Sequence, residues 1–348
     1  MRYILLLILF IGYFGSGHCQ TFKGTVYDQS SDSTLCSAII YISGTSVGTY
    51  SDVNGNFELD ISRFSSMPIT ISLLGYYSVT LTEYNCNKIY RIYLIPKIKE
   101  LNEVIIIAKK RGNWEWHLRI FKREFLGETK NAMECDILNE KDLRFSYNSD
   151  SNILRAFSRK PIIIKNKALG YTITYYLDKF KYTRYNLTRG GNGDLLETFY
   201  LGNYLFKDDL LTLSESEQRI VEERRRQAYL GSRMHFFRSL YLEDFKTKAG
   251  NKILLSDNTP FSQIFTIRSK TPINSESFVI KKDSLTGYLK HEGELYITYK
   301  KMSTTMKFRR DSVYFQKDGY FDPFEITFEG YMSDQRLGDL LPFEYSLN

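Results

Sequence analysis

Seven short runs between Thr21 and Leu94 constrain the fold of this chain more than any other feature of its sequence. In order, they are FKGTVYD, SAIIYISGT, VGTYSD, GNFELDI, PITISLLGY, YSVTLTEY and KIYRIYLI. Each run has the length of a strand, and Gly, Ser, Asp, Asn or Pro fills the intervals between runs. Short alternating runs at this spacing predict a small all-β sandwich.

Residues 48–59, GTYSDVNGNFEL, carry oxygen-bearing side chains at Asp52, Asn54 and Asn56. A calcium loop with this spacing also needs a glycine at its sixth position and a bidentate glutamate at its twelfth. Here the glycine, Gly55, is fourth, and an arginine is twelfth. Asn54-Gly55 instead favours a two-residue type I′ turn. The stretch therefore predicts a β-hairpin, with a metal loop as the alternative.

The same part of the chain resembles the carboxypeptidase regulatory-like domain, a transthyretin-like β-sandwich. The resemblance covers about residues 21–95, and the family pattern G-T-x-S-D-x-x-G-x-F corresponds here to Gly48 through Phe57. It implies that Asn54-Gly55 closes a hairpin. It also implies that four glycines are backbone positions and not active-site residues, namely Gly44, Gly48, Gly55 and Gly75. We place this domain at residues 20–95.

Residues 1–19, MRYILLLILFIGYFGSGHC, have the layout of a secretory signal peptide, with one positive charge, an apolar run and then small residues. The apolar run is shorter than the roughly 20 residues that span a bilayer, and no later run is longer. We therefore expect an exported protein, periplasmic or associated with the outer membrane, without a transmembrane span in the mature chain. A lipid anchor at Cys19 is the alternative to cleavage near Cys19 or Gln20.

Charge and cysteine content narrow the function classes. Arg2 is the only charged residue in the signal, so the net charge of +7 falls to +6 in the mature chain. Such a small charge argues against a nucleic-acid partner. Export permits a disulfide, and Cys36 and Cys86 are the candidate pair. Cys135 is then left as the odd cysteine of the mature chain. No two cysteines or histidines have metal-ligand spacing, so no metal site is expected.

Tyrosine and phenylalanine are abundant, at 27 and 24 residues. Aromatic side chains favour strands and supply core packing area. The same residues also build carbohydrate-binding surfaces, so a glycan remains open as a partner.

Residues 96–110 form a charged linker with one β-prone run, Val104 to Ala108. Residues 101–106, LNEVII, are similar to the segment that follows this domain in TonB-dependent outer-membrane receptors. The receptor itself is excluded, because the rest of the chain is too short for a plug and a barrel. The alternative is a strand that joins two domains.

Residues 111–348 predict a β-rich α+β domain. Asn113 is expected to cap a helix that buries one stripe. The stripe is Trp114, Leu118, Phe121 and Phe125. His117 lies beside it, as a packed or a solvated side chain. The runs within 153–207 and 251–331 indicate further strands, and RGGNGD at 189–194 predicts a hairpin tip, because it lacks the Gly-Lys-Ser/Thr of a phosphate cradle.

Two further helices are predicted at residues 214–229, opened by the capping box SESE, and at 231–242. The second helix is expected to bury Met234, Phe237 and Tyr241 and to turn His235 and Arg238 away. Five arginines accompany these helices, namely Arg219, Arg224, Arg225, Arg226 and Arg233. Such a row would bind phosphate, acidic glycan or lipid headgroups. Pairing with Glu215, Glu222 and Glu223 at helical spacing favours a solvated face instead.

Three separate segments of this domain resemble a region of uncharacterised exported proteins of Bacteroidota that carry the same N-terminal domain. They are Phe125 to Asn139, Asn166 to Tyr171, and Asp339 to Tyr345. With the N-terminal domain included, the resemblance spans nearly the whole mature chain. It implies an architecture and a compartment, and no activity.

The sequence identifies no catalytic, cofactor-binding or metal-ligating residue. The three histidines of the mature chain, His117, His235 and His291, lie in no known ligand spacing, and the zinc-binding domain of true metallocarboxypeptidases is missing. No G-x-S-x-G elbow occurs, and Cys135 has no identifiable base.

The leading hypothesis is therefore a non-enzymatic cell-envelope protein, a binding or structural module with an envelope protein as partner. One alternative is an accessory to TonB-dependent nutrient uptake through residues 101–107. The other is an envelope glycan or peptide hydrolase with its site in 111–348, which clustering of His235 and His291 with carboxylates would support.

Overall fold

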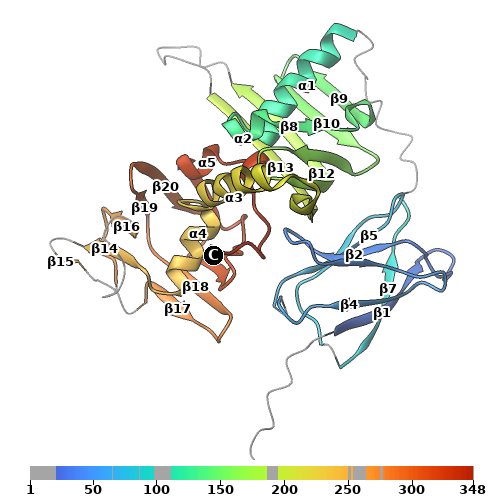
Figure 1. The fold of residues 1–348 in the computed structure, drawn as a ribbon, viewed down its shortest axis with the longest axis horizontal. Helices are drawn as coiled ribbons and strands as arrows, with labels where there is room; N and C mark the ends of the chain where they lie inside the picture. Colours follow the sequence, from blue (N-terminus) through green and yellow to red (C-terminus); the bar gives the residue numbers. More distant parts are fainter. Residues whose placement is uncertain are drawn as a thin grey trace, which may run out of the picture. The chain divides into compact units, whose positions relative to one another are not determined.

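The computed structural model describes residues 21–64, 66–85, 87–97, 111–185, 195–249, 252–253, 264–274 and 277–347 (Figure 1). The chain divides into two compact units. The first consists of Met1–Ile42 and Val47–Lys99, and the second of Ser43–Ser46 and Glu100–Asn348. Both units are mainly β, which confirms the predicted fold class.

The first unit is a β-sandwich. One sheet has the order β4-β1-β7, formed by β4 (Asn56–Asp60), β1 (Thr21–Asp28) and β7 (Ile89–Leu94), and β1 and β7 are parallel. The other sheet has the order β3-β2-β5-β6 and consists of β3 (Gly48–Tyr50), β2 (Ile39–Ile42), β5 (Ile69–Ser72) and β6 (Val79–Leu81). Alternation along β1 buries Phe22 and Val26, while β2 and β5 are buried throughout. All seven predicted strands are present.

The connection between β3 and β4 differs from the predicted hairpin, because these two strands belong to different sheets. Residues 52–56 still form a tight turn, in which Asp52 Oδ1 accepts the N–H groups of Asn54 and Asn56, both at 2.8 Å. Gly55 has a φ of +77°, but Asn54 is not among the described residues with positive φ. The Asp52 N–H donates to the Asn56 carbonyl at 2.8 Å, so residues 53–55 form a three-residue loop with one left-handed glycine in place of the type I′ turn. The turn uses the Asp52 carboxylate internally, as expected for a turn and not a metal loop.

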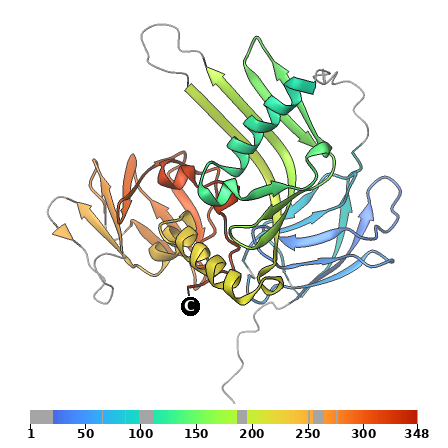
Figure 2. The same cartoon turned by 45° about the horizontal axis from the view of Figure 1, so that its top comes forward.

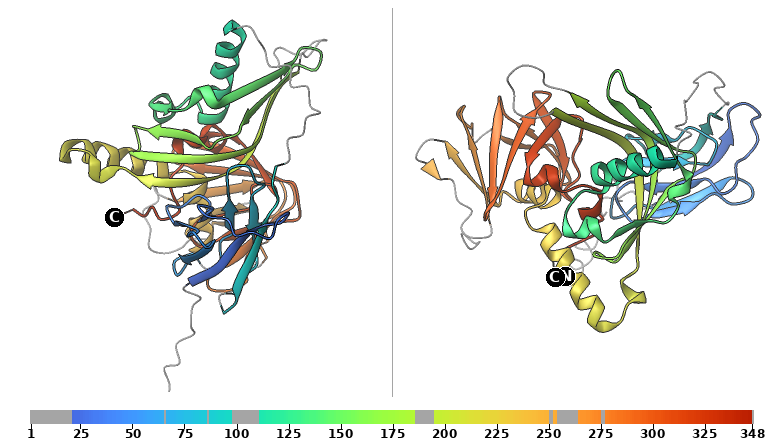
Figure 3. Two further views of the ribbon diagram at one scale, coloured as in Figure 1. Left: turned by 90° about the vertical axis from the view of Figure 1, so that its right-hand side faces the viewer. Right: turned by 90° about the horizontal axis from the view of Figure 1, so that it is seen from above.

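The second unit begins with α1 (Arg111–Leu126) and α2 (Lys130–Met133), followed by a six-stranded sheet. Its strands are β8 (Cys135–Ile137), β9 (Leu143–Asn148), β10 (Ile153–Ser158), β11 (Ile162–Asn166), β12 (Tyr171–Tyr185) and β13 (Leu195–Asp208). β12 is the central strand: β11 pairs with its first half, β10 pairs with its second half, and β13 pairs along the opposite side. Figures 2 and 3 show α1 lying along one face of this sheet.

The packing of α1 confirms the predicted stripe. Phe121 and Phe125 are completely buried, Leu118 is buried, and Trp114 packs against the same core. The predicted cap is wrong, because the helix already begins at Arg111 and Asn113 lies inside it.

The rest of the second unit builds another core around α4. α3 (Glu215–Tyr229) and α4 (Arg233–Tyr241) follow β13, and both predicted helices are present. The capping box at Ser214 and Glu217 is formed, and Ser232 caps α4. One sheet has the order β15-β14-β16-β19-β20-β22 and a second has the order β17-β18-β21.

These strands are β14 (Phe245–Ala249), β15 (Lys252–Ile253), β16 (Phe265–Ser269), β17 (Val279–Lys281), β18 (Thr286–Lys290), β19 (Glu294–Tyr299), β20 (Met302–Phe308), β21 (Ser312–Gln316) and β22 (Ile326–Gly330). Phe236, Phe237 and Leu240 of α4 are completely buried against them. The chain then forms α5 (Tyr331–Asp334) and a 3-10 helix, Leu337–Asp339.

Candidate functional site

The three segments singled out by their resemblance meet at one place in the second unit. Asp339 accepts hydrogen bonds from Thr129 Oγ1, at 2.8 and 2.9 Å, and from Asn131 Nδ2, at 2.9 Å. Asn166 is completely buried and donates to the carbonyl of Gly338 at 2.9 Å. A Cβ on Gly338 would lie 2.6 Å from the Cα of Ala132, so only glycine fits here. These contacts hold the C-terminal segment against α2 and β11.

A cavity of about 400 Å³ lies beside this junction. It is lined by Arg123, Glu124, Glu128, Thr129, Asp334 and Arg336. Its size falls within the range typical of small-molecule pockets. α1 ends just before Gly127, which has a φ of +102°, and α2 begins soon after it. Residues on both sides of this glycine therefore line the cavity.

Glu124 is the buried charge of this cavity, with 6 % of its surface exposed. Its carboxylate accepts from Arg336 Nη1 at 2.7 Å, from Thr198 Oγ1 at 2.7 Å and from Arg123 Nε at 2.9 Å. Burial opposes ionisation, but these donors outweigh it and lower the pKa of Glu124. At neutral pH Glu124 is therefore an ionised carboxylate that is paired with both guanidinium groups of the lining.

The pKa of Asp339 is shifted in the opposite direction, upwards. The residue is 7 % exposed, and burial raises its pKa although Thr129 and Asn131 donate to it.

Glu128 and Asp334 are exposed, and neither carboxylate has a hydrogen-bond or ion-pair partner in the described part of the chain. The lining of the cavity thus carries two carboxylates without a partner among the described residues.

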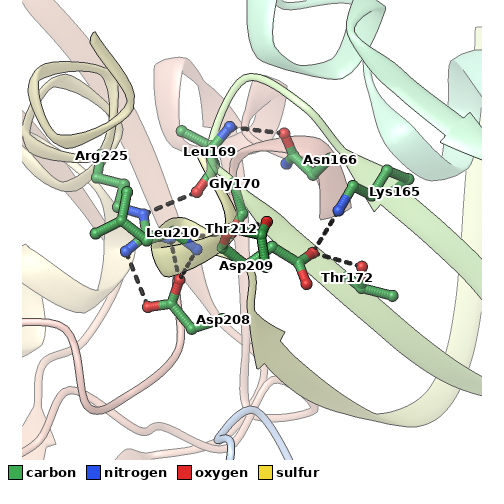
Figure 4. Close-up of polar contacts among 10 residues, drawn as sticks. All are labelled: Lys165, Asn166, Leu169, Gly170, Thr172, Asp208, Asp209, Leu210, Thr212 and Arg225. Atoms are coloured by element: carbon green, nitrogen blue, oxygen red, sulfur yellow. Dashed lines mark hydrogen bonds and ion pairs between the residues drawn. The ribbon is translucent and has the colours of Figure 1, made fainter. Parts of the chain in front are cut away.

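A second polar network holds α3 to the end of the β12–β13 pair (Figure 4). The Arg225 guanidinium pairs with Asp208 at 2.7 and 3.1 Å, and it donates to the carbonyls of Leu169 and Gly170. It also lies 3.8 Å above the ring of Tyr171. Next to it, bonds from Lys165 and Thr172 outweigh burial and lower the pKa of Asp209. Each charged side chain of this network has a hydrogen-bond partner within the protein.

The predicted arginine row is therefore not one face. Arg225 is buried, Arg224 pairs with Glu134 at 2.8 Å, and Arg233 donates to the carbonyl of Gln335. Arg226 pairs with Glu223, as the solvated interpretation expects. The row splits because α3 packs one side against the sheet and leaves the other in solvent.

His235 and Arg238 do not face away from the core, contrary to the prediction. His235 packs against Tyr229, Phe265 and Tyr299, and its Nδ1 accepts the N–H of Gly231 at 3.0 Å. Burial lowers its pKa to about 4. Arg238 donates to the carbonyls of three residues, Asp318, Phe343 and Tyr345. The prediction fails because strands and the C-terminal segment enclose α4 on both sides.

His291 lies in the connection between β18 and β19 and contacts two hydroxyl groups. Its Nε2 is 2.6 Å from Ser269 Oγ and 3.0 Å from Thr271 Oγ1. Each hydroxyl donates its proton to a backbone carbonyl, of Glu294 and of Glu292 respectively. When both hydroxyls donate to these carbonyls, Nε2 is the protonated nitrogen that donates to them. The contacts join the end of β16 to the connection between β18 and β19.

His117 and Cys135 are buried without an acid–base partner. His117 is 2 % exposed and packs against Trp116, Phe145 and Tyr147, and its Nδ1 has no partner in the structure as described. Burial lowers its pKa. Burial raises the pKa of Cys135 to about 12, so its thiol stays protonated. Cys36 is an exposed free cysteine.

Several sequence predictions fall on residues outside the described ranges. They are the signal peptide at 1–19 with Cys19, the partner cysteine Cys86, most of the linker at 96–110, and the turn at 189–194. Within the described ranges, no cluster of three or more potential metal ligands occurs, and no helix is long and apolar enough to cross a membrane.

Sequence reasoning missed the cavity residues Glu124 and Arg336 and the role of Asp339 in the junction beside the cavity. A signal existed for one of them, because Glu124 follows Phe121 by three residues and so falls on the buried side of α1. A carboxylate on an apolar stripe indicates a buried partner.

The comparisons with known proteins address the first unit. No curated protein matches the chain. A family model, described as the CarboxypepD_reg-like domain, matches residues 22–106 and so extends past the predicted domain end at residue 95. The β-sandwich of the first unit is therefore a carboxypeptidase regulatory-like domain.

Proposed function

We propose that this protein is exported and acts in the cell envelope as a non-enzymatic binding module built on a carboxypeptidase regulatory-like domain. Arg2 and the apolar run from Tyr3 to Phe14 support export. The regulatory-like domain is consistent with a non-catalytic role. In the described part of the second unit, Glu124, Asp209 and Asp339 each accept hydrogen bonds that hold the fold together.

The cavity at Glu124 carries the binding part of this proposal. Its lining holds three carboxylates and two guanidinium groups, and both guanidinium groups already bind Glu124. Glu128 and Asp334 remain free to pair with an incoming group. A ligand with an exposed ammonium or guanidinium group fits this charge, as on a basic peptide side chain or a polyamine.

Titration calorimetry of the mature chain with L-arginine amide and putrescine tests the proposal, with acetate as the anionic control. Binding of the cationic probes, weakened about tenfold in a Glu128→Gln/Asp334→Asn variant, is the expected result, since each lost charge pair contributes on the order of 1 kcal/mol. Glu222→Gln on α3 is the matched control, because it removes an exposed carboxylate that does not line the cavity.

Equal binding by the double variant and the parent chain would reject the cavity as the site. Fractionation of cells that express the full chain, or a chain without residues 1–19, tests export separately. Recovery of both forms in the cytoplasm would contradict the envelope assignment.

A further inference from the structure

β13 has one edge that the sheet leaves open. Along one side it pairs with β12 over its whole length. On the other side, at its C-terminal part, the Tyr204 carbonyl accepts the N–H of Gly44, and the Phe206 N–H donates to the carbonyl of Thr45, both at 2.8 Å. Residues Ser43–Ser46 belong to the second unit, and Thr45 forms a parallel bridge with Leu205. This edge therefore already pairs, at its C-terminal part, with a short segment from outside the sheet.

The same bonds show which backbone groups of β13 point outward. Tyr204 and Phe206 point away from β12, and residues of a strand alternate between its two edges. The only register shift between the two strands lies in β12, between Leu177 and Lys179, so the alternation in β13 is unbroken. The N–H and C=O groups of four more residues thus point outward, namely Leu196, Thr198, Tyr200 and Gly202. Among the described residues, none of these groups has a hydrogen-bond partner.

This open stretch lacks the features that normally keep edge strands apart. Such edges carry charges, prolines or bulges. Between Leu195 and Phe206, Glu197 is the only charged residue, and there is no proline. Leu196 and Leu201 are 50 % and 37 % exposed. The edge is thus suited to pairing with another strand.

We propose that a second copy of this chain pairs antiparallel with β13, with Phe199 on the two-fold axis. Thr198 then faces Tyr200 of the second copy, and Leu196 faces Gly202 of the second copy, so outward-pointing groups meet outward-pointing groups. The two Phe199 rings form a cross-strand aromatic pair.

The charges fit this register. Glu197 faces Leu201 of the second copy, whose neighbour on β12 is Lys179. No like charges of β13 face each other in this register, and the Glu197 carboxylate, which accepts the Tyr185 hydroxyl at 3.0 Å, lies one strand away from Lys179 of the other copy. The strand is therefore complementary to itself about this axis.

Sedimentation velocity of the mature chain over a range of concentrations tests the proposal. We expect a monomer–dimer equilibrium. Phe199→Glu and Phe199→Lys each place like charges on the axis and raise the dimer dissociation constant by at least about tenfold. An equimolar mixture of the two variants restores a heterodimer, which a misfolded variant would not do. Leu211→Glu is the matched control, since this side chain is 92 % exposed outside the edge.

Three results would overturn the proposal. The first is a monomer at every concentration. The second is a dimer that both Phe199 variants leave unchanged. The third is a mixture of folded variants, checked by circular dichroism, that does not associate.

Discussion

The two units differ in the kinds of polar side chain that they bury. Among the described residues of the first unit, the buried polar side chains are hydroxyl groups, on Ser51, Thr70 and Ser72. The second unit buries ionisable groups, which are His117, Glu124, Asp209, Arg225 and Asp339. The sandwich buries apolar side chains of its strands, whereas the second unit joins helices to sheets through charges from distant segments. Breaking a buried charge pair costs far more than losing a hydroxyl contact.

The largest effect is expected for Arg225→Met. The substitution leaves the carbonyls of Leu169 and Gly170 without their donor and removes the ion pair with Asp208. Asp208 is 51 % exposed and still accepts the Leu210 N–H, so the two carbonyls account for most of the expected loss of about 3–4 kcal/mol in the free energy of unfolding. Thr70→Val in the sandwich removes one contact to Thr80 and should cost about 1 kcal/mol.

Urea unfolding measures both variants. The two tryptophans of the chain, Trp114 and Trp116, lie in α1, so tryptophan fluorescence reports the second unit and far-UV circular dichroism reports both units. Equal costs for the two substitutions would remove the contrast between the units.

The next effect concerns pH. In the folded protein the pKa of His235 is lowered to about 4, from an ordinary value of 6.5. As the pH falls through 6.5, the unfolded chain binds a proton that the folded chain does not, so stability is lost between pH 6.5 and about 4. The loss attributable to this group is roughly 3 kcal/mol.

Residues 20–99 contain no histidine, so this loss falls on the second unit. Unfolding of the parent chain and of His235→Gln at several pH values checks it, with tryptophan fluorescence as the signal. Parallel stability curves for the two chains would show that His235 does not carry the pH dependence.

A smaller effect tests the turn in the first unit. Asp52→Ala removes the acceptor for the N–H groups of Asn54 and Asn56 and should cost about 1 kcal/mol, because the site is exposed. Thermal unfolding with and without calcium chloride is the measurement, and we expect no calcium effect. A calcium-dependent rise in Tm that disappears in Asp52→Ala would restore the metal-loop alternative.

The smallest effect is expected at Arg226, the residue next to Arg225 in the chain. Arg226 pairs with Glu223 at 3.5 Å, with more than half of each side chain exposed. Arg226→Gln should change the free energy of unfolding by no more than about 0.5 kcal/mol. Urea unfolding beside Arg225→Met measures the difference between adjacent arginines. A cost for Arg226→Gln near that of Arg225→Met would show that exposure does not decide the role of these arginines.

Local patterns predicted the elements of both units well. The seven strands of the sandwich, the stripe of α1 and the capping box of α3 all follow from residues close together in the chain. Predictions that depended on surroundings failed, as for the exposed side of α4 with His235 and Arg238. Periodicity identifies one buried side of a helix, but it does not show whether a second layer covers the other side.

The pairing of β3 and β4 failed for a related reason. Asn54-Gly55 predicts a turn, and a turn is present, but the two strands it joins pair with other partners. A short sequence signal specifies the backbone of its own residues, and the choice of sheet depends on strands elsewhere.

The sequence by itself determined where strands and helices form, because alternation, helical spacing and capping act over a few residues. Only the tertiary structure decided which ionisable groups are buried and what they bind. Asn131 reaches Asp339 across 208 positions of the chain, and Arg336 reaches Glu124 across 212. Such contacts place separated charges in one low-dielectric site, and the energy of each depends on partners that no local pattern reveals.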